Sequence, residues 1–105
     1  MSDITELGHF VGGRVVAGTS GNTSPVYNPA TGQQTGNVAL ASVEELDAAV
    51  ATANAAFQEW RYSSVAKRTE AMFNLRNLVK TNASELAAKI TAEHGKVHSL
   101  SLIHI

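Results

Sequence analysis

The sequence has 105 residues, of which 44% are apolar and 16% charged, and its formal net charge is -1. This length and composition predict one globular domain. The small net charge gives no electrostatic reason to expect nucleic acid or an anionic membrane as a partner. The sequence contains no apolar run that would span a bilayer. The absence of cysteine excludes disulfides, thiolate metal sites and a cysteine nucleophile from these residues, and a start without signal-peptide features makes the cytoplasm the expected location.

The first forty residues, rich in Gly, Thr, Asn and Val, predict short strands joined by turns. Residues 9–11 and 14–16 flank Gly12 and Gly13, and two glycines tolerate the positive φ values of a tight hairpin turn. The sequence therefore predicts a β-hairpin at the start of the chain.

A second turn is expected over residues 28–32, after a short extended segment at Val26 and Tyr27. Asn28 can close an Asx-type hydrogen bond, the following proline fixes φ, and Gly32 tolerates a left-handed exit. The chain then predicts two short strand pieces, at residues 33–35 and 37–40, interrupted by a glycine.

The first helix is predicted from residue 43, after a capping box formed by Ser42 and Glu45. Apolar residues follow at steps of three and four, which places them on one face of the helix. They are Val43, Leu46, Val50, Ala53, Phe57 and Trp60.

Two further amphipathic helices are predicted, the first capped by Ser64 and the second by Asn82. Gly95 is expected to end the last helix in the left-handed conformation. The residues expected to face inward are Val65, Met72, Leu75, Leu78 and Val79 in one helix, and Leu86 and Ile90 in the other.

Histidines near the end of the chain are the candidate metal ligands. His94 and His98 have the i, i+4 spacing of a helical metal pair, but Gly95 between them predicts a helix end, and no carboxylate follows Glu93. Exposed or unstructured histidines, His104 included, are the favoured interpretation, and no metal site is assigned.

The glycines at positions 12, 13, 18 and 21 do not form a phosphate-binding motif, because neither the G-x-G-x-x-G spacing nor a following helix is present. They are interpreted as turn residues. No nucleophile is paired with a base, and no two carboxylates stand at a catalytic separation. No catalytic, cofactor-binding or metal-ligating residue is therefore assigned.

Four segments in order resemble the N-terminal region of the aldehyde dehydrogenase superfamily, over residues 8–96. They are FVGGRVVAG, VYNPATGQQTGNVALAS, VEELDAAVATANAAFQEW and KRTEAMFNLRNLVKTNASELAAKITAEHGK. Within the superfamily, HFVGGRVVAGTSG, AMFNLRNL and EHGK are most similar to methylmalonate-semialdehyde dehydrogenases of the coenzyme A-acylating type.

The resemblance implies an α/β fold of which this chain is an N-terminal excerpt, with a hairpin and short strands followed by three helices. Residues 1–96 would be a partial cofactor-binding domain of a homo-oligomeric parent, a dimer or tetramer, that oxidises a small semialdehyde with NAD and passes the acyl group to coenzyme A. The parent's cysteine nucleophile and cofactor residues would lie beyond Lys96, so the chain alone is expected to bind no cofactor and to be inactive.

Residues 97–105 match nothing expected of that family and are expected to be a tail produced by truncation or a frameshift. Their last seven residues, SLSLIHI, alternate loosely and could form a strand. Two alternatives stay open: a fragment of a non-acylating NAD(P)-dependent aldehyde dehydrogenase, and a small stand-alone helical interaction module. With the helix faces left without a sheet to cover, burial is expected to be incomplete.

Overall fold

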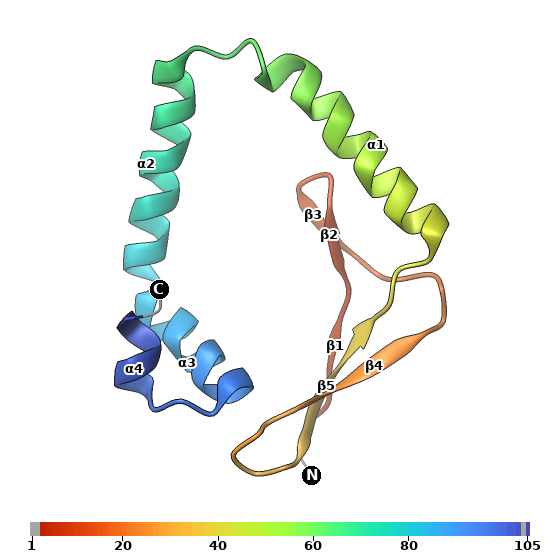
Figure 1. The fold of residues 1–105 in the computed structure, drawn as a ribbon, viewed down its shortest axis with the longest axis vertical. Coiled ribbons are helices and arrows are strands. Elements are labelled where there is room, and N and C mark those ends of the chain that lie inside the picture. Colours follow the sequence, from red (N-terminus) through yellow and green to blue (C-terminus); the bar gives the residue numbers. More distant parts are fainter. Residues whose placement is uncertain (1–2, 104) are drawn as a thin grey trace. The chain divides into compact units, whose positions relative to one another are not determined.

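A computed structural model describes residues 3–103 and 105 (Figure 1), and these divide into two compact units. The first unit contains the strands and the first helix, α1. The second contains the turn at residues 28–33 and the helices α2, α3 and α4. The mixture of short strands and helices confirms the predicted α/β class.

The first unit is built on a three-stranded sheet in the order β1-β5-β4. β1 (Thr5–Leu7) pairs parallel to β5 (Gln34–Ala39), and β4 (Thr23–Tyr27) pairs antiparallel to it. The prediction of two strand pieces interrupted by Gly36 was wrong, because β5 is continuous through that residue. A Cβ atom on Gly36 would lie 2.9 Å from the Thr5 carbonyl oxygen, so glycine is what lets β1 approach.

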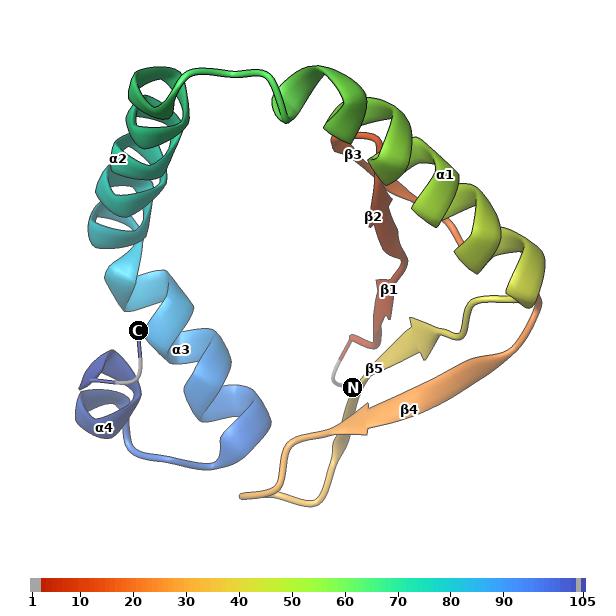
Figure 2. The ribbon, with the colours of Figure 1, turned by 45° about the horizontal axis from the view of Figure 1, so that its top comes forward.

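The predicted β-hairpin is confirmed in the first unit. β2 (His9–Val11) and β3 (Arg14–Val16) pair antiparallel, with His9 opposite Val16. Gly12 and Gly13 join them with φ values of 64° and 79°, which match a type I′ turn. Figure 2 shows this hairpin lying beside α1.

α1 (Val43–Trp60) begins at the predicted capping box. The Ser42 hydroxyl accepts the Glu45 backbone N–H at 3.1 Å, and the Glu45 carboxylate accepts the Ser42 N–H at 2.8 Å. These two bonds satisfy donors that a helix start otherwise leaves open. A helix of five turns follows without a break.

The first helix of the second unit is α2 (Val65–Thr81). Ser64 caps it as predicted, because its side chain accepts the Lys67 N–H at 3.1 Å. α3 (Ala83–His94) ends at Gly95, whose φ of 80° confirms the left-handed C-terminal residue. The predicted side-chain cap by Asn82 was wrong. Asn82 has a ψ of 15° and donates its side-chain amide to the Leu78 carbonyl at 2.8 Å, so it closes α2 instead of capping α3.

At the end of the chain, where loose alternation indicated that a strand could form, residues 98–103 form the helix α4 (His98–Ile103). Ser101 is fully buried and shares a 2.8 Å hydrogen bond with Thr91 of α3. Ala87 of α3 is the only fully buried apolar side chain among the described residues. These small residues allow two helices to approach closely.

The turn between β4 and β5 belongs to the second unit and has the predicted chemistry. The Asn28 side chain accepts the Ala30 N–H at 2.9 Å, and Gly32 has a φ of 70°. A Cβ atom on Gly95 would meet the Pro29 ring at 3.2 Å, so the turn lies against the end of α3.

Burial of the helices is incomplete, as predicted. Phe57 is 50% exposed and Trp60 44%, whereas a packed core leaves such side chains almost no exposure. Val43, Val50, Met72 and Leu75 are each more than half exposed, and Ile90 is half-buried. The described residues therefore leave most of the apolar helix faces uncovered.

Candidate functional site

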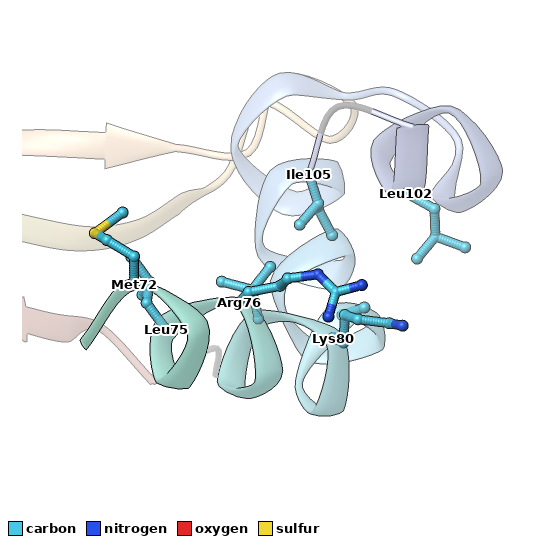
Figure 3. A pocket seen from close by; sticks show the side chains of 8 residues that line it. Met72, Leu75, Arg76, Lys80, Leu102 and Ile105 are labelled. Atoms are coloured by element: carbon cyan, nitrogen blue, oxygen red, sulfur yellow. The ribbon is translucent and has the colours of Figure 1, made fainter. Parts of the chain in front are cut away.

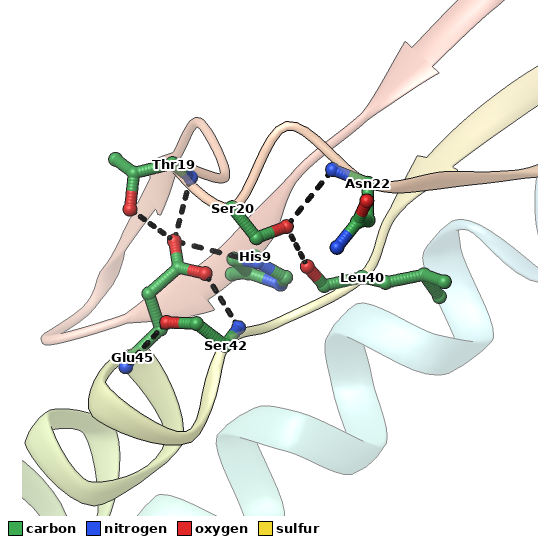
Figure 4. Close-up of polar contacts among 7 residues, drawn as sticks. All are labelled: His9, Thr19, Ser20, Asn22, Leu40, Ser42 and Glu45. Carbon is green, nitrogen blue, oxygen red and sulfur yellow. Dashed lines mark hydrogen bonds and ion pairs between the residues drawn. The ribbon is translucent and has the colours of Figure 1, made fainter.

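A cluster of polar contacts in the first unit surrounds Glu45, at the start of α1 (Figure 4). Its carboxylate accepts the Thr19 N–H at 2.7 Å and the Thr19 hydroxyl at 2.9 Å, in addition to the Ser42 N–H. His9 of β2 lies with Nε2 4.0 Å from the same carboxylate. One side chain thus joins a strand, a loop and a helix.

A second set of hydrogen bonds holds the loop that carries Thr19. The Ser20 hydroxyl donates to the Leu40 carbonyl and accepts the Asn22 N–H at 3.1 Å. The Leu40 N–H in turn donates to the Asn22 carbonyl at 2.9 Å. These bonds fix the loop to the segment between β5 and α1. They also hold Thr19 where its N–H and hydroxyl reach the Glu45 carboxylate.

Electrostatics at this cluster favour the ionised carboxylate. The hydrogen bonds from the Ser42 and Thr19 backbones, then that from the Thr19 hydroxyl, lower the pKa of Glu45 from 4.5 to about 2, with a minor contribution from His9. The side chain is only 18% exposed. A carboxyl group with such a pKa carries no proton near neutral pH and is a poor general acid or base there.

The surroundings of Glu45 also do not suit a dinucleotide. Phosphate groups bind the free N–H groups at a helix start, but here the Glu45 N–H is bonded to Ser42 and a carboxylate already occupies the end of α1. The start of α2 is likewise closed by Ser64. The starts of α1 and α2 are therefore occupied by groups of the chain itself, and the Glu45 cluster fastens the loop at Thr19 to α1.

The turn interpretation of the glycines is confirmed at three positions, since Gly12, Gly13 and Gly21 have positive φ. Gly18 serves a different purpose. A Cβ atom there would lie 2.6 Å from the Ala39 side chain and 3.2 Å from His9 Nε2. The loop can therefore approach Ala39 and His9 this closely only with glycine at this position.

The C-terminal histidines fall on different elements. His94 ends α3 and His98 starts α4, where its Nε2 donates to the Ser84 carbonyl at 3.2 Å. His104 lies outside the described residues. Across residues 3–103 and 105 no group of three or more His, Asp or Glu side chains could hold a metal ion, and no helix has the length and apolar character to cross a membrane.

A groove of about 480 Å³ in the second unit runs along α2 (Figure 3). Its apolar lining includes Met72, Leu75, Leu102 and Ile105, and its charged lining consists of the cations Arg76 and Lys80. Among the described residues, Lys80 is the only lining residue of a type that catalysis uses as a nucleophile or base, and no carboxylate or histidine lines the groove beside it. This groove has no chemistry beyond apolar contact and positive charge.

The low pKa of Glu45 predicts an acid-sensitive first unit. A lowered pKa stabilises the folded state above pH 4.5, and this contribution disappears as the pH falls from about 4.5 to about 2. We expect Glu45→Gln to lower the melting temperature at pH 7 and to flatten the dependence of melting on pH across that window. Thermal melting followed by circular dichroism at 222 nm measures both.

Glu44→Gln is the matched control, because Glu44 occupies the same first turn, is exposed, and lacks the contacts of Glu45 with Thr19 and Ser42. Its melting is expected to follow that of the unmodified chain at every pH. If the two variants lost stability equally at pH 7, the hydrogen bonds of Glu45 would not fasten the loop to the helix.

Comparison with known proteins links most of the chain to one family. The family model for the aldehyde dehydrogenase family matches residues 15–105. The chain is 46% identical over 98 residues to malonate-semialdehyde dehydrogenase 3 of Geobacillus kaustophilus, covering 93% of this chain and 20% of that protein. It is 36% identical over 95 residues to the human mitochondrial methylmalonate-semialdehyde/malonate-semialdehyde dehydrogenase, named as acylating, covering 90% and 18%.

Solved structures agree with these sequence matches. A crystal structure from Sinorhizobium meliloti, assigned as a methylmalonate-semialdehyde dehydrogenase and solved with NAD, is 42% identical and has a TM-score of 0.96. The match covers 100% of this chain and 21% of that one. A methylmalonate-semialdehyde dehydrogenase of Oceanimonas doudoroffii follows with 32% identity and a TM-score of 0.90. The chain spans about a fifth of the length of the relatives it matches.

Proposed function

This chain belongs to the aldehyde dehydrogenase family, and from that membership we propose that it is the N-terminal part of an NAD-dependent, coenzyme A-acylating (methyl)malonate-semialdehyde dehydrogenase. One observation carries the proposal: three curated relatives, each matched over nine-tenths of the chain or more, are named as malonate- or methylmalonate-semialdehyde dehydrogenases. One of them is named as acylating, and a solved neighbour was crystallised with NAD.

The proposed reaction converts malonate semialdehyde, NAD⁺ and coenzyme A to acetyl-CoA, carbon dioxide and NADH. The aldehyde carbon loses its hydride to NAD⁺ and forms a thioester bond to sulfur, which releases the thiol proton. The bond to the carboxylate breaks, carbon dioxide leaves, and the carbon that carried it takes up one proton. The methyl-substituted substrate gives propionyl-CoA. The first thioester needs a cysteine nucleophile, and this chain contains no cysteine. The chemistry therefore belongs to the parent protein, and these 105 residues alone are inactive.

The parent is proposed to be a cytoplasmic homo-oligomer, a dimer or tetramer, whose partner is a small semialdehyde and not a membrane or a nucleic acid. Residues 1–96 are proposed to form part of its cofactor-binding domain. The family match also includes residues 97–105, which were expected to be a tail outside the family. Sequencing the gene beyond the codon for Lys96 tests that expectation.

The assay for the parent follows NADH absorbance at 340 nm in the full-length gene product with malonate semialdehyde, with and without coenzyme A. We expect turnover that depends on both NAD and coenzyme A. Turnover that does not depend on coenzyme A would instead identify a non-acylating dehydrogenase. Two solved neighbours, at 32% and 29% identity, are named only as aldehyde dehydrogenases. Their names support the non-acylating dehydrogenase as the alternative function.

A further inference from the structure

His9 of β2 is the member of the Glu45 cluster whose contact is incomplete. Its side chain is 22% exposed, and its Nε2 atom is buried without a hydrogen-bond partner among the described residues. Figure 4 shows the His9 ring beside the Glu45 carboxylate, with Nε2 4.0 Å from Oε1. A buried polar atom that forms no hydrogen bond destabilises a fold, and this one lies just beyond the reach of an acceptor.

The Glu45 carboxylate determines which ring nitrogen of His9 carries the proton. Hydrogen bonds from Ser42 and Thr19 keep this carboxylate ionised, so it can only accept. A lone pair on Nε2 would face the negative charge and be repelled, whereas an N–H at that position is attracted. The geometry therefore favours the neutral tautomer with its proton on Nε2, which leaves Nδ1 to take up a second proton.

No other charged group near His9 replaces Glu45 as its partner. The loop at residues 17–22 and the segment at residues 38–42 carry no charged side chain. The remaining charged side chains at the neighbouring ends of the surrounding elements are exposed, and they are Glu6 in β1, Arg14 in β3, and Glu44 and Asp47 in α1. Arg14 lines the same groove as His9 and Glu45, but its charge is solvated.

The contact spans the groove between the hairpin β2–β3 and α1. This groove has a volume of about 550 Å³, and His9 lines it from the hairpin while Glu45 lines it from the helix. Histidine is the side chain that ordinarily gains or loses its charge between about pH 5 and pH 8. A second proton on His9 converts the near contact into a charge-assisted hydrogen bond, which is about twice as strong as a neutral one.

We propose that His9 and Glu45 form a pH-dependent latch, which joins the hairpin β2–β3 to α1 and narrows the groove when His9 is charged. The stabilisation is present at mildly acidic pH and is lost as the pH rises and His9 becomes neutral. Glu45 stays ionised throughout this range, because its pKa is about 2. The latch goes beyond the proposed function and does not depend on the reaction of the parent protein.

Hydrogen exchange of the 105-residue chain at about pH 5.5 and about pH 7.5 tests the latch, with protection factors corrected for the intrinsic effect of pH. We expect the amides of residues 9–16 to be about fivefold better protected at the lower pH. His9→Gln removes the titrating ring, and equal protection at both pH values is expected. His94→Gln is the matched control, because His94 is exposed at the end of α3 in the second unit, and it should keep the full difference.

A second measurement needs no substitution. In a chain labelled with ¹⁵N-histidine, the nuclear magnetic resonance shifts of the ring nitrogens show which nitrogen of neutral His9 carries the proton. We expect Nε2. We also expect the Thr19 amide resonance to shift as His9 gains charge, because the Thr19 N–H and His9 Nε2 are directed at the same oxygen of Glu45.

Four results would overturn the latch. A proton on Nδ1 of neutral His9 would contradict the assigned tautomer, and equal protection of the hairpin at both pH values in the unmodified chain would show that no latch closes. A pH difference that survives His9→Gln would assign the effect to another group. A hairpin without protection at either pH would mean that it is not held beside α1.

Discussion

The purified 105-residue chain is expected to reduce no NAD with any aldehyde and to bind NAD no tighter than about 1 mM. Enzymes typically lower the barrier by about 8 kcal/mol or more, and without cysteine the chain lacks the nucleophile that its family's chemistry needs. At the starts of α1 and α2, the Ser42 and Ser64 side chains already bind N–H groups that could otherwise hold a pyrophosphate. Isothermal calorimetry and NADH absorbance measure the two quantities.

The positive control is full-length Geobacillus kaustophilus malonate-semialdehyde dehydrogenase 3, assayed under the same conditions. Saturable micromolar binding of NAD by the 105-residue chain would contradict the prediction, above all if a substitution within residues 8–96 abolished it. Such binding would require a site formed from residues that are now assigned to turns and helix caps.

Replacing Ala87 by Asp is expected to release α4 from α3. Ala87 is fully buried and, by helical spacing, shares a face of α3 with Ser84 and Thr91, which contact α4. Burying an unpaired carboxylate costs several kcal/mol. A helix of six residues has too little contact area to balance that cost. Hydrogen exchange should therefore show the amides of residues 98–103 losing all protection, together with the hydrogen bond between Thr91 and Ser101.

Ala88→Asp is the matched control, because Ala88 is the next residue of the same helix and is exposed. It is expected to change helix propensity by only about 0.7 kcal/mol and to leave protection of α4 intact. Equal loss of protection in both variants would mean that α4 does not pack on α3 through Ala87.

Local chemistry predicted the ends of elements well. The capping box at Ser42, the turn at Asn28 and the left-handed Gly95 each depend on residues within five positions of one another, so a short sequence window contains all the information. The amphipathic pattern of α1 is similarly local. These features were confirmed because no distant contact competes with them.

Features that depend on distant residues were missed. β1 has no pattern of its own and exists through parallel pairing with β5, about thirty residues later. At the end of the chain, loose alternation of apolar residues indicated a possible strand, but the segment is the helix α4, whose Ser101 is buried and hydrogen-bonded to Thr91 of α3. The sequence predicted Glu45 as a helix cap, but its bonds to Thr19, 26 residues away, became visible only in the fold.

The family assignment follows from the order of segments, whereas the chemistry of the parent rests on the names of relatives. The most direct measurement is identification of the product that the full-length gene product forms from malonate semialdehyde, NAD and coenzyme A, by mass spectrometry of the acyl-CoA. We predict acetyl-CoA, formed in equal amount with NADH and carbon dioxide. Free malonate formed at the same rate without coenzyme A would contradict the proposed acylating reaction.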